Sequence, residues 1–95
     1  MLEIRQTDEF RTWVRHLSDG RAAKKIAQRI ARVRSGLLGD AKYFSGIGEL
    51  RINHGPGYRL YFVRRGNVIV VLLCGGDKSS QQRDIKLAIK LAQEV

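Results

Sequence analysis

The sequence is poor in cysteine and in long apolar segments. Cys74 is the only cysteine, which excludes an internal disulfide framework and any zinc site built from several thiolates. The longest apolar run, residues 68–74, is far shorter than the roughly 20 residues of a membrane-spanning helix, and the first residues lack the apolar segment of a signal peptide. We therefore expect a soluble, cytoplasmic protein with no membrane partner.

Acidic residues are also scarce. The chain has 9 Asp and Glu against 18 Lys and Arg, so its net charge is +9 at pH 7. An excess of this size indicates a polyanionic partner such as a nucleic acid. The acids form no metal-ligand spacing with His16 or His54, so we expect neither a metal nor a cofactor.

The length and the hydrophobic content predict one folded domain over residues 1–95. At 95 residues the chain can bury one modest core, and 43% hydrophobic residues are too many for disorder driven by charge. Helical spacing of apolar residues alternates with period-two segments and turn residues. The predicted elements are a strand at 2–6, a helix capped by Thr7 and ending near 18–20, a helix at 21–35, a loop at 39–48, strands at 49–53, 58–64 and 68–74, and a last helix with a capping box from Ser79 to Gln82.

This order predicts an α+β fold in which three consecutive strands form an antiparallel meander and a C-terminal helix closes the chain. Leu50, Ile52, Leu60 and Phe62 share one strand face and form the core with the helices. By parity Arg51, Arg59 and Tyr61 lie on the opposite face, which we expect to be partly open. Lys78 comes after the last strand, so three cations can converge there.

The most basic segment is the second predicted helix. Six basic residues and no acid lie between Arg21 and Arg34, and like charges at helical spacing repel one another. A polyanion would relieve this repulsion, and ribosomal RNA is the natural candidate. We expect these side chains on the solvent face of the helix, with Lys24, Lys25, Arg29 and Arg32 as RNA contacts.

Two segments carry a family resemblance: ELRINHGPGYRLYFVRRG and, after it, VIVVLLCGGDKSSQQRDI. They resemble the RelE/ParE superfamily of type II toxin–antitoxin modules, and more narrowly the HigB-like addiction module killer proteins. The resemblance implies a RelE-like fold with an N-terminal strand and a helical hairpin, and a toxin that stops growth and is neutralised by a cognate antitoxin, often a helix-turn-helix protein. For ribosome-dependent members it implies an mRNA endoribonuclease, or mRNA interferase, that inhibits translation. Operator DNA would be bound only through the antitoxin complex.

Metal-free RNA cleavage requires a base for the 2′-hydroxyl, cations at the phosphate and an acid for the leaving oxygen. Arg59, in the GYR motif, is the candidate grip on the scissile phosphate, with Arg51 as a second clamp. Lys78 is a third cation and a candidate proton carrier. For the acid, the resemblance points to the start of the last helix, where this chain has Asp84 in place of tyrosine or histidine. Tyr61 and His54 are substitutes, and the acid stays unassigned.

Other interpretations remain open. Exposed arginines on a strand often only keep a sheet soluble, His54 can be an ordinary turn residue, and Cys74 at the end of a buried strand is a small apolar residue. The ParE branch is associated with inhibition of DNA gyrase without RNA cleavage, and a nucleic-acid-binding protein without toxicity is a third possibility. The segment GGDKS lacks the spacing of a phosphate-binding P-loop, so nucleotide hydrolysis is not expected.

Overall fold

The computed structural model describes all 95 residues as a five-stranded mixed sheet with three α-helices, in the strand order β1-β5-β4-β3-β2. The α+β prediction is therefore confirmed. None of the helices is long and apolar enough to cross a membrane. The elements are β1 (Glu3–Gln6), α1 (Asp8–Arg15), α2 (Gly20–Arg34), β2 (Ala41–Phe44), β3 (Ile47–Ile52), β4 (Tyr58–Arg65), β5 (Ile69–Gly76), a single 3₁₀ turn (Lys78–Ser80) and α3 (Gln81–Glu94).

Both N-terminal helices begin at side-chain caps. Thr7 accepts a hydrogen bond from the Phe10 amide at 3.0 Å, which fixes the start of α1. Asp19 accepts from the amides of Arg21 and Ala22 at 2.9 and 3.2 Å and so starts α2. The two caps begin the helices that the chain forms after β1 and before it returns to the sheet at β2. The Asp19 cap also fixes where the basic helix α2 starts.

The sheet contains one strand more than the sequence predicts. The expected loop at 39–48 is wrong, because Ala41–Phe44 forms β2 and pairs antiparallel with β3. Ser45 and Gly46, with φ of 52° and 79°, form the turn that joins the two strands. The meander therefore has four strands, β2 to β5, and β1 joins it parallel to β5. A four-residue edge strand between glycines shows too little alternation to be distinguished from a loop.

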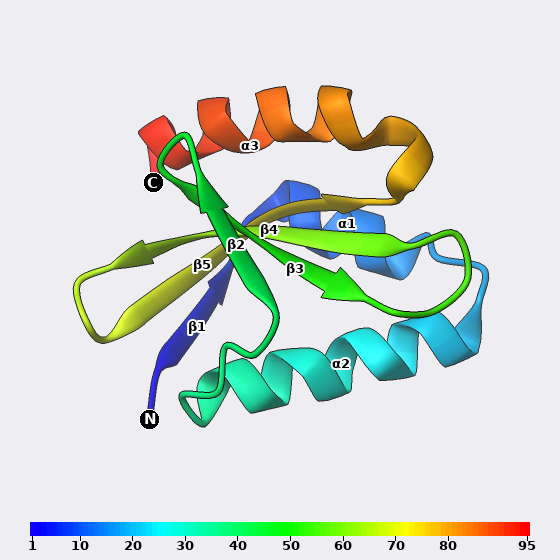
Figure 1. Cartoon of the computed structure of the whole chain (residues 1–95), viewed down its shortest axis with the longest axis horizontal. Coiled ribbons are helices and arrows are strands. Elements are labelled where there is room, and N and C mark those ends of the chain that lie inside the picture. Colours follow the sequence, from blue (N-terminus) through cyan, green and yellow to red (C-terminus); the bar gives the residue numbers. More distant parts are fainter.

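Helices pack on both faces of the sheet, so α3 covers most of the face that was expected to be partly open, and Arg51 remains exposed there. On one face Phe10 of α1 and Ile26 of α2 pack with the predicted core residues Leu50, Leu60 and Phe62. On the other face α3 packs on the sheet through its buried Ala88, Leu91 and Ala92. In Figure 1 α2 and α3 lie on opposite sides of the strands. Alternation correctly predicts which residues share a face, but it does not show that a helix covers that face.

The last part of β5 is irregular, and the turn after it differs from the sequence prediction. Tyr61 pairs with Cys74 and Phe62 with Leu72, so Leu73 is an extra residue, and both Leu73 and Cys74 pack under α3. Beyond the strand, the predicted Ser79–Gln82 capping box is wrong. Asp77 instead accepts from the Ser79 amide, and Ser80 Oγ accepts from the Asp77 amide.

Candidate phosphate site and nucleic-acid interface

Arg51 and Arg59 lie directly opposite each other on β3 and β4. Residues in register on adjacent strands project to the same side of the sheet, so the two guanidiniums are neighbours rather than splayed apart. Arg59 is 8% exposed, whereas the Arg51 side chain is 47% exposed. The pair therefore has one fixed, buried member and one accessible member.

A buried carboxylate holds both arginines. Glu49 is 1% exposed, and its Oε1 lies 3.7 Å from Arg51 Nε while its Oε2 lies 3.8 Å from Arg59 Nε. Gln81, at the start of α3, donates a hydrogen bond of 3.1 Å to the same Oε2. Alternation along the strand places Glu49 on the same face as Arg51, but the sequence alone assigned no role to Glu49. Because Glu49 is enclosed, it positions the two arginines.

The third predicted cation is close to Arg59. Arg59 Nη1 donates a hydrogen bond of 2.7 Å to the Gly57 carbonyl. A Cβ built on Gly57 would lie 3.3 Å from that nitrogen and 3.7 Å from the Lys78 Cβ, so Arg59 and Lys78 flank the same glycine. The Lys78 amide is also 3.4 Å from the Pro56 carbonyl, and its side chain is exposed. The three cations predicted from sequence therefore gather at one end of the sheet.

Tyr61 does not reach this surface. Its side chain is fully buried beneath α3, and its hydroxyl has no hydrogen-bond partner. Burial, and then the negative charge of Glu49, raise the pKa of the Tyr61 hydroxyl far above its usual value. Tyr61 is thus a core residue rather than an accessible proton donor.

Asp84 is also enclosed. It is 6% exposed, it accepts a hydrogen bond from the Ser80 hydroxyl, and its carboxylate packs on the backbone of Gly76 where any side chain would clash. Arg83 Nε lies 3.7 Å from its other oxygen. These contacts fasten the first turn of α3 to the end of β5, so Asp84 acts in the fold.

His54 ties two loops together. Its Nε2 lies 3.0 Å from Asp19 Oδ2, so the imidazole joins the β3–β4 turn to the cap of α2. The hydrogen bond from His54, and then that from the Ala22 amide, lower the pKa of Asp19. A structural role for His54 in its turn agrees with this contact.

A small pocket of about 280 Å³ adjoins the arginine pair, and we call it the strand-end pocket. Arg51 and Arg59 line it together with Tyr58, which is half-buried and packs edge-on against Trp13. Sequence reasoning treated Tyr58 only as a packing residue, because its parity differs from that of Arg59. At the end of β4, residues that point to opposite faces of the sheet, such as Tyr58 and Arg59, border the same pocket.

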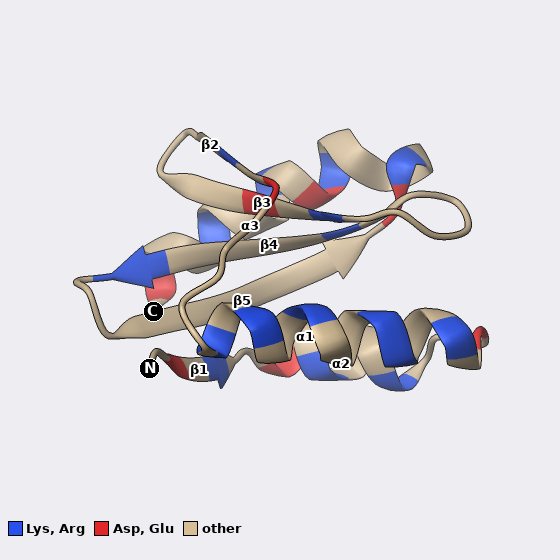
Figure 2. Ribbon diagram, turned by 60° about the horizontal axis from the view of Figure 1, so that its bottom comes forward, with Lys and Arg blue, Asp and Glu red and all other residues tan.

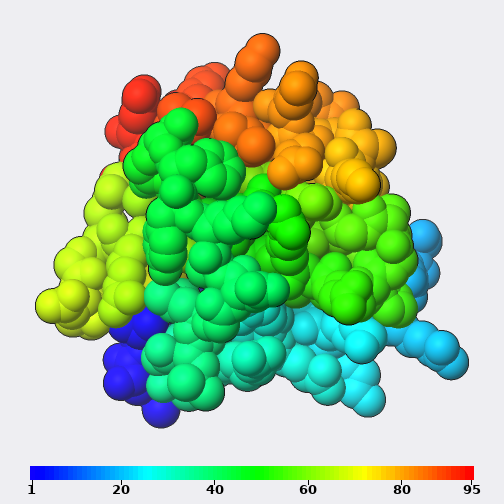
Figure 3. Space-filling view, viewed as in Figure 1, coloured from blue at the N-terminus to red at the C-terminus, as the bar shows by residue number.

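The basic helix α2 contributes a second concave surface. A cleft of about 450 Å³, called here the α2–β3 cleft, is lined by Lys25, Gln28, Arg29, Arg32, Asp40, Arg51, Ile52 and Asn53. It shares Asp40, Arg51, Ile52 and Asn53 with the strand-end pocket, so the two are contiguous. Figure 2 shows Lys and Arg along the length of α2, and Figure 3 shows the strand region (green) at the surface between α2 and α3.

The four predicted RNA contacts separate into three groups. Lys25 and Arg32 are exposed and line the cleft, whereas Lys24 is exposed outside it. Arg29 contradicts the expectation of a solvent face, because it is 7% exposed and belongs to the buried row of α2 with Ala22, Ile26 and Val33. No three His, Cys, Asp or Glu side chains lie close enough together to hold a metal ion.

A relative of this chain matches it over the whole domain. No family model matches the chain. An uncharacterized protein of Haemophilus influenzae is 48% identical over 95 residues, which cover 99% of this chain and 96% of the relative. The two proteins belong to one family. The family therefore extends over the full domain, from β1 to α3, and is not limited to one motif.

Proposed function

We propose that this chain is the toxin of a type II toxin–antitoxin module of the RelE/ParE kind, and that it cleaves mRNA on the ribosome without a metal ion. The observation that carries the proposal is the cross-strand pair of Arg51 and Arg59, held by one buried carboxylate. The order of strand, helical hairpin, meander and C-terminal helix also fits the fold that the resemblance implies.

The geometry suits an anionic transition state. Arg59 cannot change its direction freely, because Gly57 and Glu49 both hold its guanidinium. A fixed guanidinium stabilises developing phosphate charge without reorganisation at the moment of reaction. Arg51 and Lys78 are exposed beside it and would close on the phosphate from the solvent side.

Proton transfer falls to groups near the arginine pair that are not enclosed. Tyr58 lines it, and Lys78 lies beside Arg59, whereas the hydroxyl of Tyr61 and the carboxylate of Asp84 are enclosed. Tyr58 therefore replaces Tyr61 as the proposed proton donor to the leaving oxygen.

Replacing Arg59 tests the proposal directly. In bacteria that express the chain from an inducible promoter, Arg59→Ala should abolish growth arrest and reduce mRNA cleavage by at least about a hundredfold, the usual scale for loss of an oxyanion-stabilising group. Arg64→Ala is the matched control, because Arg64 lies on the same strand and is exposed away from the site. Circular dichroism would establish that both variants fold. Wild-type killing and cleavage by a folded Arg59→Ala variant would show that the site is misplaced.

A second function, inhibition of DNA gyrase by binding alone, is favoured by the enclosure of Tyr61 and Asp84, which leaves few proton donors near the arginines. Mapping of new mRNA 5′ ends after brief expression separates the two functions. A nuclease gives breaks at preferred codons, whereas a gyrase inhibitor gives a DNA-damage response without such breaks. A nucleic-acid-binding protein without toxicity would cause neither mRNA breaks nor a DNA-damage response.

A further inference from the structure

Arg29 is a buried cation without a partner. Neither of its terminal nitrogens, Nη1 and Nη2, makes a hydrogen bond, and no carboxylate lies within 4.0 Å of the guanidinium. Burial, and then the charge of Arg32, lower the pKa of Arg29, and the negative charge of Asp40 offsets only part of this effect. Buried polar groups in folded proteins are nearly always satisfied, and a charged one left unsatisfied is costly. An unpaired guanidinium at this depth therefore requires an explanation.

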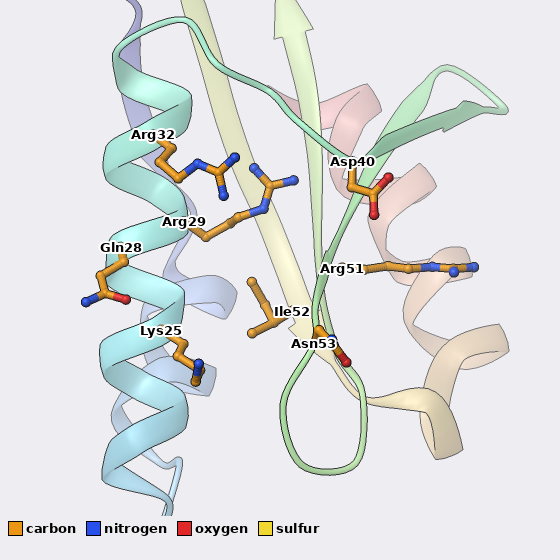
Figure 4. A pocket seen from close by; sticks show the side chains of 8 residues that line it. All are labelled: Lys25, Gln28, Arg29, Arg32, Asp40, Arg51, Ile52 and Asn53. Atoms are coloured by element: carbon orange, nitrogen blue, oxygen red, sulfur yellow. The ribbon is translucent and has the colours of Figure 1, made fainter.

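The position of Arg29 supplies one, because it lies in the wall of the α2–β3 cleft. Figure 4 shows Arg29 and Arg32 reaching from α2 toward the strands, whereas Asp40 and Arg51 point away from Arg29, and Lys25 of the same helix also lines the cleft. Lysine and arginine side chains donate hydrogen bonds and accept none. The cleft thus presents three cationic donor groups, and Asp40, the one carboxylate in its lining, forms no ion pair with any of them.

The backbone around the cleft is shaped to the guanidinium. Gly39, at φ +62°, lies so close that an added Cβ would be 3.1 Å from Arg29 Nη1 and 3.2 Å from Nη2. A side chain at position 39 would press on the guanidinium, whereas the bare glycine backbone leaves room for it. The 39–40 segment that leads into β2 therefore encloses Arg29 without pairing with it.

We propose that the α2–β3 cleft binds a backbone phosphate of single-stranded RNA, on the guanidinium of Arg29 with Arg32 and Lys25 beside it. This phosphate is separate from the one at Arg59. Because Arg51 borders both the cleft and the strand-end pocket, one strand can occupy both. The inference rests on the proposed function for the nature of the strand, but it does not require that the strand is cleaved.

The test measures RNA binding instead of cleavage. A short, fluorescently labelled single-stranded RNA is titrated with the full-length protein at several salt concentrations. Arg29→Met should weaken binding about tenfold, the effect expected for one charge-assisted contact. It should also reduce the slope of log K against log salt by about 0.7. Arg34→Met is the matched control, because it removes an exposed arginine of the same helix outside the cleft, and it should change affinity much less.

Two further variants keep the outcomes distinct. Arg32→Met removes an exposed cation of the same cleft and should weaken binding even if Arg29→Met fails to fold. Arg59→Ala should lose cleavage while the salt dependence due to Arg29 persists, so failure of the nuclease proposal is separable from failure of the cleft.

Three results would overturn the inference. Equal losses in Arg34→Met, Arg29→Met and Arg32→Met would show that RNA binds the helix surface in general. Unchanged RNA affinity in folded Arg29→Met and in Arg32→Met would remove the cleft from the RNA path. If a poly-glutamate peptide bound the wild type and lost affinity in Arg29→Met while RNA binding did not change, the cleft would belong to an acidic protein partner.

Discussion

The strand-end pocket and the α2–β3 cleft each contain a buried arginine, but the two arginines differ in their partners. Arg59 Nη1 donates to a carbonyl and its Nε, which makes no hydrogen bond, lies 3.8 Å from a carboxylate, whereas Arg29 has neither partner. A partner holds a buried guanidinium in place and offsets part of its desolvation cost, whereas an unpaired one destabilises the fold until an anion arrives. The comparison teaches that a buried arginine with a protein partner suits a fixed position in a site, whereas one without a partner suits the binding of an anion from solution.

The strongest way to break the comparison is to remove the carboxylate that distinguishes the two sites. Glu49→Gln leaves Arg59 buried without a counter-charge, as Arg29 already is, and we expect a loss of about 3 kcal/mol in the free energy of unfolding. Urea denaturation measures it, with the exposed Glu94→Gln as control. A loss below about 0.5 kcal/mol, the usual scale of a surface substitution, would mean that Glu49 does not hold the pair.

The next largest effect is on the free energy of unfolding, which should change in opposite directions when each buried arginine is replaced by methionine. Arg29→Met removes an unpaired buried charge and fills its space with apolar atoms, so we expect the free energy of unfolding to rise by about 1 to 2 kcal/mol. Arg59→Met deprives Glu49 of a partner and should lower it. Urea denaturation in phosphate-free buffer measures both, with Lys24→Met as the neutral reference. If Arg29→Met is instead destabilising, the guanidinium of Arg29 stabilises the fold without a bound anion.

The smallest expected effect is a dependence of stability on pH. An aspartate caps a helical segment near each site: Asp19 caps α2, and Asp77 caps the 3₁₀ turn that begins at Lys78. A hydrogen bond from His54 lowers the pKa of Asp19 at the start of α2, and one from the Ser79 hydroxyl lowers that of Asp77 beside Lys78. Each lowered pKa contributes stability that is fully present above the unfolded value near 3.8 and is lost as the pH falls through the folded value.

Urea midpoints at about pH 6 and about pH 3, on either side of the unfolded value, check this expectation. Asp19→Asn and Asp77→Asn should each be less stable than wild type at the higher pH, and the differences should shrink at the lower one. Differences that stay constant between the two pH values would assign the effect to shape instead of charge.

Residue spacing predicted much of the fold and of the arginine pair. Alternation placed Arg51 and Arg59 on one face, and helical spacing found α2, because both depend on neighbours along the chain. The covering of Tyr61 by α3 depends on packing between segments far apart in the sequence, which no local pattern encodes. The burial of Arg29 was hidden by its residue type, although its position three residues after Ile26 and four before Val33 fits the core row.

The additional residue in β5 has an effect beyond the strand itself. Side chains of a strand alternate, so a single insertion reverses the orientation of every position after it. Residues 75 and 76 consequently meet Trp13 and Asp84, contacts that only glycine can make without collision. Gly76 thus gives α3 a close seat, and Gly75 admits the indole of α1 on the other face. Leu73, an apolar residue, therefore sets the phase of the strand end from which the chain continues to Lys78.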